Sequence, residues 1–216
     1  MQNVRETVAV PGWGASVNGE RTIAAVDADD ALIARFLAGH RSAFDSLFAR
    51  YQDYVYNIVH GIVGSSDDAR DVTQEVFVQV YRSLPSFRRG SRFATWLYRI
   101  AVNRAVDSAR SARGRRWLPL METLSATPDP DANPARSAEK GADKDTIQGI
   151  LSQVPIQHRD VLVLKYYQDL SVEEIAEVLG ISVTAAKVRL HRARNYFKET
   201  YVAALGKEAD RENALS

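Results

Sequence analysis

The sequence predicts an all-α protein of two small helical domains joined by a flexible, proline-containing linker, and three observations lead to this prediction. Apolar residues recur at three- and four-residue intervals in several segments, which is the period of an amphipathic helix. Small polar residues precede these segments and glycine or proline follows them, as at helix ends. Between the two sets of helices lies an acidic stretch with four prolines, which disfavours a continuous helix.

Length and composition exclude several classes of protein. The chain has 216 residues, enough for one or two domains with hydrophobic cores. It has no cysteine and four scattered histidines, so we expect no disulfide, no metal site and no cofactor. No apolar run approaches the length of a membrane span, and the N-terminus lacks the basic-then-apolar order of a signal peptide. These features predict a cytoplasmic protein.

The first part of the chain is predicted to hold a tail and two helices. Residues 1–26 show no sustained period and are expected to be flexible. Asp29 or Asp30 is expected to cap the first helix, and Ser42 to cap a long second helix that closes at Gly64.

A third helix is predicted to start after Ser65 and to end at Pro85. One side of it carries an apolar stripe, and the other side carries acidic residues at helical spacing. These polar positions are Asp68, Asp71, Gln74 and Glu75. A solvated face whose acids interact favourably with the helix N-terminus is the ordinary interpretation of such a row.

The next segment is strongly basic and includes a fourth predicted helix over residues 95–110. From Arg82 to Arg116 there are ten arginines against one aspartate. Trp96, Arg99 and Asn103 lie on one side of this helix, where an indole could stack a base, a guanidinium hold a phosphate and a carboxamide contact a base edge. Packing of Trp96 against the preceding loop is an equally good interpretation.

Residues 170–197 are predicted to form two short helices joined by a tight turn. Ser171 and Glu174 have the spacing of a capping box, and Gly180 can supply the left-handed conformation of a sharp helix exit. Ser182 is expected to cap the second helix, whose outer side is cationic. This arrangement is typical of a helix-turn-helix, although a helical hairpin with a solvated basic face would have the same pattern. After about Ala204 the chain is expected to fray.

Two separate stretches resemble one family. DARDVTQEVFVQVYRSLPSF followed by FATWLYRIAVNRAVD resembles domain two of bacterial sigma factors, and SVEEIAEVLGISVTAAKVRLHRAR resembles their domain four. The order of the two, the short linker and the lack of a domain three are similar to the extracytoplasmic-function (ECF) group. The resemblance implies a tail (1–26), domain two (27–112), a linker (113–145), domain four (146–205) and a C-terminal tail (206–216).

The resemblance implies a role for three sets of residues. Contacts to the clamp of the largest subunit of core RNA polymerase would come from Asp68, Asp71, Gln74 and Glu75. Contacts to the melted minus-10 promoter element would come from Phe87, Arg88, Arg89, Gly90, Ser91, Phe93, Trp96, Tyr98, Arg99 and Asn103. Contacts to the minus-35 element as duplex would come from Thr184, Lys187, Val188, Arg189, His191, Arg192 and Arg194.

By the same resemblance, the partners are core RNA polymerase, including the flap of its second-largest subunit, and promoter DNA. An anti-sigma factor, often membrane-anchored, would hold the protein inactive near the inner membrane until a stress signal. No small-molecule substrate is implied. The family commonly has Gly-Thr-Val where this chain has Thr184-Ala185-Ala186, which puts the base-by-base correspondence in doubt at that point.

Two other functions compete with that of a promoter-specificity subunit. A stand-alone helix-turn-helix regulator would explain residues 170–197 but would leave the acidic row and the Trp96 face without a purpose. An enzyme acting on nucleic acid would need a carboxylate cluster, a nucleophile with its base, or a phosphate-binding glycine loop, and none stands out. We therefore expect no catalytic activity.

Overall fold

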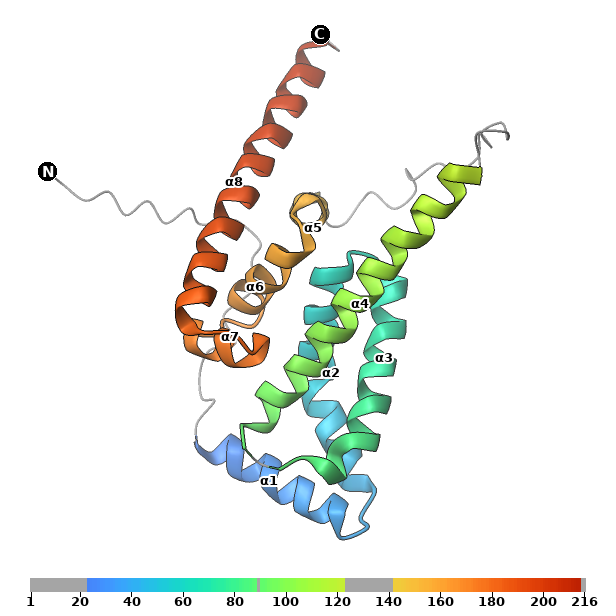
Figure 1. Ribbon diagram of the computed structural model, residues 1–216, viewed down its shortest axis with the longest axis vertical. Helices are drawn as coiled ribbons and strands as arrows, with labels where there is room; N and C mark the ends of the chain where they lie inside the picture. The colour runs from blue at the N-terminus through green and yellow to red at the C-terminus, as the bar shows by residue number, and fades with distance from the viewer. Residues whose placement is uncertain (1–22, 89, 123–141, 215–216) are drawn as a thin grey trace, which may run out of the picture.

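The computed structural model describes residues 23–88, 90–122 and 142–214, and every regular element in them is a helix (Figure 1). The first unit comprises α1 (Ile23–Leu37), α2 (Ser42–Val63), α3 (Ser66–Ser83) and α4 (Phe93–Glu122), with a 3-10 turn at Leu84–Ser86. The second unit comprises α5 (Ala142–Gln153), α6 (Ile156–Tyr166), α7 (Val172–Leu179) and α8 (Val183–Ala214). The all-α prediction is confirmed.

Helices α2, α3 and α4 form a bundle, and α1 crosses one end of it (Figure 1). The buried side of α2 follows the period expected from the sequence, with Leu47, Val55, Ile58 and Ile62 fully enclosed. The helix ends at Gly64, which has a left-handed φ of 91°. Ser65 then caps α3, its side chain accepting a hydrogen bond from the Asp68 N–H at 3.3 Å. Both of these predicted helix ends are confirmed.

The predicted starts of the first two helices are wrong. Helix α1 already begins at Ile23, and Asp29 lies within it. The Asp29 carboxylate is buried, and it accepts hydrogen bonds from the Arg50 guanidinium and the Tyr51 hydroxyl of α2. A short acidic side chain can either cap a helix or accept hydrogen bonds in the core, and the sequence alone did not distinguish these two roles for Asp29. The cap position of α2 is occupied by Arg41, which makes no side-chain capping bond, rather than by Ser42.

Two helices extend further than predicted. Helix α4 continues to Glu122, past the predicted start of the linker and through Pro119. Only one of the four prolines lies inside this helix of 30 residues, and the other three follow its end in the sequence. Helix α8 continues to Ala214, although fraying was expected after about Ala204. The predicted tail up to residue 22 and linker residues 123–141 lie outside the described residues.

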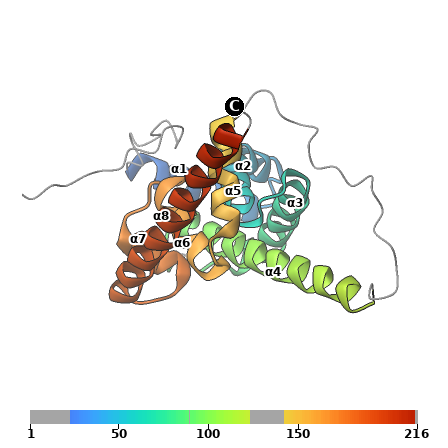
Figure 2. The same cartoon turned by 90° about the horizontal axis from the view of Figure 1, so that it is seen from above.

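The two units pack directly against each other. Figures 1 and 2 show α6 between α8 on one side and α2 on the other, while α7 lies against α4. Buried apolar side chains of both units belong to one continuous hydrophobic core. Within the described residues, no helix is both long enough and apolar enough to cross a membrane.

Candidate functional site

Helices α7 and α8 have the geometry of a helix-turn-helix. The Glu174 N–H donates to Ser171 Oγ at 3.1 Å, and the Ser171 N–H donates to Glu174 Oε2 at 2.9 Å, which completes the predicted capping box. Gly180 follows with a left-handed φ of 66°. The Ala185 N–H then donates to Ser182 Oγ at 3.1 Å, so Ser182 caps α8 as predicted.

The N-terminal part of α8 has one buried side and one exposed side. Ala186, Leu190 and Ala193 are buried against the rest of the unit. The exposed side carries most of the residues predicted to face duplex DNA, namely Thr184, Lys187, Val188, His191 and Arg192. Val188 is 46% exposed, so this surface combines cations with an apolar side chain that could contact a thymine methyl group.

Two other predicted DNA contacts of α8 are engaged with α6. Arg189 donates to Asp160 Oδ2 at 2.7 Å and to the Gln157 carbonyl. Arg194 donates to the Tyr166 hydroxyl at 2.8 Å, and its guanidinium lies 5.7 Å from the centre of that ring. These contacts position α8 on α6, a role that the sequence pattern did not indicate. Contact of either arginine with DNA remains a prediction.

Burial controls the ionisation of the groups beneath α8. Burial raises the pKa of Asp160 to about 6, although Arg189, the Val161 N–H and Arg110 act in the opposite direction. Burial also lowers the pKa of His158, with smaller contributions from Arg189 and Arg192. The underside of α8 therefore contains an ion pair that is sensitive to pH.

The loop before α4 and the start of that helix form an aromatic cluster. The Trp96 ring lies with its centroid 5.0 Å from that of Phe87 and 5.8 Å from that of Phe93, and it is half-buried. In the structure Trp96 thus packs against this loop, which was one of the two interpretations of the sequence. Around the cluster, Arg88 and Gly90 are exposed and Ser91 is half-buried, while Arg89 lies outside the described residues.

Two of the predicted minus-10 residues have buried side chains, namely Phe93, which is 5% exposed, and Tyr98. Tyr98 is 1% exposed and belongs to the core of the bundle, with its ring centroid 6.5 Å from that of Tyr51. At this position of α4 the side chain points inward, and a DNA contact of Tyr98 stays a prediction. The helical period placed Tyr98 on the buried side, and only the family resemblance moved it to the DNA face.

One of the remaining minus-10 candidates on α4, Arg99, contacts the second unit. Asn103 and Arg99 are exposed, but Arg99 donates from Nε to the Val178 carbonyl at 3.3 Å and from Nη2 to the Glu177 carbonyl. Both acceptors lie at the C-terminal end of α7. These contacts were not predicted from the sequence, because they join residues nearly eighty positions apart.

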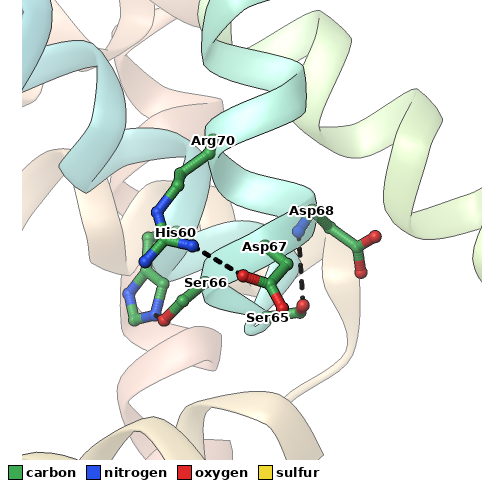
Figure 3. Close-up of polar contacts among 6 residues, drawn as sticks. All are labelled: His60, Ser65, Ser66, Asp67, Asp68 and Arg70. Carbon is green, nitrogen blue, oxygen red and sulfur yellow. Dashed lines mark hydrogen bonds and ion pairs between the residues drawn. The ribbon is translucent and has the colours of Figure 1, made fainter.

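Helix α3 presents the predicted polar row to the surface. Figure 3 shows its first turn, where Asp67 pairs with Arg70 at 2.6 Å and the Asp68 carboxylate points away from the other labelled residues. Ser66 Oγ lies 3.4 Å from His60 Nε2, which joins this turn to the end of α2. Further along, the predicted row borders a shallow groove lined by Asp71, Gln74, Glu75, Val78, Arg82 and Arg104.

The groove has mixed charge. Glu75 and Arg104 approach to 4.0 Å across it, and Arg104 also donates to Gln79 at 2.7 Å. The Glu75 side chain nevertheless remains 61% exposed. Among the described residues, no group of three or more potential metal ligands lies together.

Comparison with known families matches both units. Residues 47–115 match the model of Sigma-70 region 2, and residues 144–196 match that of Sigma-70 region 4. The chain is similar to the ECF RNA polymerase sigma factor SigW of Bacillus subtilis, at 32% identity over 74% of this chain and 90% of the relative. It is also similar to the RNA polymerase sigma-H factor of Pseudomonas aeruginosa, at 34% identity over 77% of this chain and 90% of the relative.

Two solved structures have a similar fold. One is CnrH in complex with the cytosolic domain of CnrY, with a TM-score of 0.60 and 28% identity over 82% of this chain and 99% of CnrH. The other is the sigma factor RpoE of Bartonella quintana in complex with the anti-sigma factor NepR, with a TM-score of 0.54 and 20% identity. That match covers 73% of this chain and 95% of RpoE.

Proposed function

The chain belongs to the extracytoplasmic-function sigma factors of RNA polymerase, and from this premise we propose that it binds core polymerase and directs promoter-specific initiation of transcription. The observation that supports this most is the presence, in family order on one chain, of a region 2 match and a region 4 match. The proposed division places domain two at 27–112 and domain four at 146–205. Selection of a promoter by such a protein is a matter of binding, so we propose no catalytic activity of its own.

The exposed side of α8 is proposed to bind the minus-35 element in the major groove. Lys187, His191 and Arg192 can donate to base edges or phosphates, and Val188 can contact a thymine methyl group. Near the start of this helix Thr184 and Ala185 are exposed, and their small side chains leave room for close approach to the DNA backbone at that end.

The start of α4 and the loop before it are proposed to bind the melted minus-10 element. Phe87 and Trp96 offer aromatic surface for unstacked bases, Arg88 is exposed next to Phe87, and Asn103 is exposed about two turns further along α4. Extruding a base costs a few kcal/mol, which stacking and edge hydrogen bonds in such a pocket would offset.

The polar row of α3 is proposed to dock on the clamp of core polymerase, with domain four on the flap of the second-largest subunit. Asp68 and Asp71 are exposed, and their helix α3 lies on the side of the bundle away from the second unit (Figure 1). Because core polymerase is the partner, we propose that the protein acts in the cytoplasm. The CnrH and RpoE structures each contain a second protein, and for RpoE it is named an anti-sigma factor, so we propose a cognate anti-sigma factor here.

Run-off transcription would test the proposal. Purified protein and core polymerase of the source organism would be incubated with fragmented genomic DNA of that organism. Discrete transcripts that require this protein are expected, and their start sites would define both promoter elements. If no transcript appeared while the protein alone shifted specific fragments, the chain would be a stand-alone helix-turn-helix regulator instead.

A further inference from the structure

Helix α6 contacts two different sides of α8. Arg189 and Tyr196 are seven residues apart, so they lie on the same side of α8, and both contact the N-terminal half of α6. Arg194 lies five residues after Arg189, which places it about 140° further around the helix axis. There it contacts Tyr166, at the C-terminal end of α6. Two arginines of the proposed DNA-binding helix therefore have partners on α6, one on each side of α8.

The partners of these two arginines differ in charge. Arg189 is paired with the Asp160 carboxylate at 2.7 Å, so a negative charge lies against its guanidinium. Arg194 donates from Nε to the Tyr166 hydroxyl at 2.8 Å, and a hydroxyl is uncharged. A DNA phosphate would have to compete with a carboxylate for Arg189, but it would meet no such competitor in the Tyr166 hydroxyl at Arg194.

The contact with Tyr166 uses only part of the Arg194 guanidinium. Within the described part of the chain, Arg194 donates hydrogen bonds from Nε alone, and its guanidinium lies 5.7 Å from the centre of the Tyr166 ring. The two terminal nitrogens of a guanidinium can bind two oxygens of one phosphate side by side. Both residues are exposed, Tyr166 by 37%. The tyrosine thus orients a cation that stays accessible.

The place of Arg194 along α8 fits the edge of a major groove. Helix α8 begins at Val183, and the second helix of a helix-turn-helix contacts base edges with its N-terminal residues. Arg194 lies ten residues after Thr184, which is about 15 Å along the helix axis. Because the major groove is about 12 Å wide, a side chain this far from the first turn lies near the phosphates at the border of the groove. Lys187, two turns before Arg194, is exposed on the same side of α8.

An arginine that is oriented before binding loses less freedom when it binds. The guanidinium is planar and stacks on aromatic rings, so a tyrosine can hold it with the edge of its fork directed away from the ring. Rotamer-rich side chains that must be ordered on binding reduce affinity, and prior ordering removes part of that cost.

We propose that Tyr166 is a positioning residue for DNA binding, which orients Arg194 toward a backbone phosphate of the minus-35 duplex. The inference rests on the proposed function, and it adds a residue of α6 to the DNA-binding surface of α8. Because the contact is to a phosphate, it contributes to affinity and not to the choice of sequence.

Titration of a fluorescently labelled duplex of arbitrary sequence with the full-length protein tests the phosphate contact without polymerase. Arg194→Gln is expected to weaken binding at low salt by roughly three- to tenfold and to reduce the slope of log K against log salt by about 0.9, the value for one phosphate. The matched control is Arg70→Gln, which removes the same charge at an exposed position of α3. An unchanged slope in Arg194→Gln, or an equal change in the control, would overturn the proposal.

The role of Tyr166 is tested by its dependence on Arg194. Tyr166→Phe keeps the ring and removes the hydroxyl, so it is expected to weaken duplex binding by about threefold through loss of the orienting hydrogen bond. In the Arg194→Gln background the same change should have no effect, because no guanidinium is left to orient. Tyr81→Phe, at a similarly exposed tyrosine of α3, is the control. No weakening by Tyr166→Phe, or equal weakening in both backgrounds, would overturn the positioning role.

Sequence dependence separates a phosphate contact from the reading of bases. On duplexes of unlike sequence, Arg194→Gln and Tyr166→Phe should each weaken binding by a constant factor. A factor that changes with the sequence would show that Arg194 contacts bases, and the proposal would be wrong.

Core polymerase loaded with each variant supplies a second readout on a promoter found by run-off transcription. The same factors are expected there, because the minus-35 element is bound as duplex. Absence of transcripts from the wild-type protein would contradict the proposed function, while the duplex titrations would still decide the role of Tyr166. Transcription without any effect of either variant on promoter affinity would overturn the inference and leave the proposed function intact.

Discussion

The ion pair between Asp160 and Arg189 holds α8, the second helix of the helix-turn-helix, against α6. Arg189 belongs to α8, yet its guanidinium is directed toward α6, where the buried Asp160 carboxylate accepts its hydrogen bond. Asp160 Oδ1 is also satisfied, because it accepts a hydrogen bond from the Val161 N–H at 2.6 Å. The orientation of α8 relative to α6 therefore depends on a carboxylate that burial makes harder to ionise.

The raised pKa of Asp160 predicts a pH-dependent stability. In the unfolded chain this carboxyl ionises near 3.8, and in the fold its pKa is about 6. Between these two pKa values the folded state binds more protons than the unfolded state. The contribution of Asp160 to the free energy of unfolding is therefore full at low pH and is lost as pH rises through about 6. The loss is on the order of 2–3 kcal/mol.

Urea unfolding of the wild type and of Asp160→Asn would measure this contribution. The free energy of unfolding of the wild type, minus that of the variant, should fall as pH rises from about 4 to about 7.5. Asparagine keeps an acceptor for the Val161 N–H but does not titrate, and His158 titrates in both proteins. A difference that stays constant with pH would show that the pKa of Asp160 is not raised.

At the residue scale the sequence predicted which side chains are exposed better than it predicted which residues they contact. It placed Lys187, Val188 and Arg192 on the exposed side of α8, because that placement follows from helical periodicity alone. It did not predict the anchoring of Arg189, because its partner lies 29 residues away on another helix. For Tyr98 the helical period predicted burial and the family resemblance predicted a DNA contact; the side chain is buried, and the DNA contact stays a prediction.

At the scale of elements, most of the correct predictions and most of the wrong ones concern where a helix begins or ends. Ser65, Ser171 and Gly180 act locally, within a few residues of the groups that they satisfy, and each was predicted. The start of α1 was missed because Asp29 has a long-range partner instead of a local one. The end of α4 was missed because the helix continues through Pro119, a residue that usually ends a helix, and the end of α8 because a charged segment does not by itself stop one.

Gly180 supports a prediction about the turn of the helix-turn-helix. A Cβ at this position would meet nothing within 4 Å, so substitution has only a backbone cost, which arises from the left-handed φ of 66°. Gly180→Ala is expected to lower the free energy of unfolding by about 1–2 kcal/mol, and Gly180→Asn by less, because asparagine tolerates this conformation. Urea unfolding would measure both. Equal losses in the two variants would show that another effect dominates.

The packing of the whole molecule is the feature that the sequence did not predict. The residues pointed to two helical units and a linker, which is compatible with separate domains. What joins the units is a set of contacts between α2 and α6, including Gly61 against Val163, and neither residue stands out in a local pattern. The run of apolar residues on α6 can be seen in the sequence, but only the fold shows that α2 and α8 cover it from two sides.

Charge at the scale of the molecule is segregated rather than uniform. The net charge is +1, yet the first turns of α3 are acidic while the loop before α4 and the outer side of α8 are basic. The acidic surface is exposed and lies apart from the helices that join the two units, so it is accessible to a partner. Its proposed partner is the clamp of core polymerase.

Reversal of charge on α3 tests that assignment. Asp71→Lys/Glu75→Lys is expected to weaken binding to core polymerase by at least about tenfold, because like charges brought together at an interface cost several kcal/mol. The matched control, Asp53→Lys/Glu199→Lys, makes the same change in net charge at exposed positions on α2 and α8. Co-purification and titration of fluorescently labelled protein with core would measure both. Since the two variants share one net charge, equal binding by them would remove the docking role from α3, whereas loss only in the first would localise the polymerase contact to its polar row.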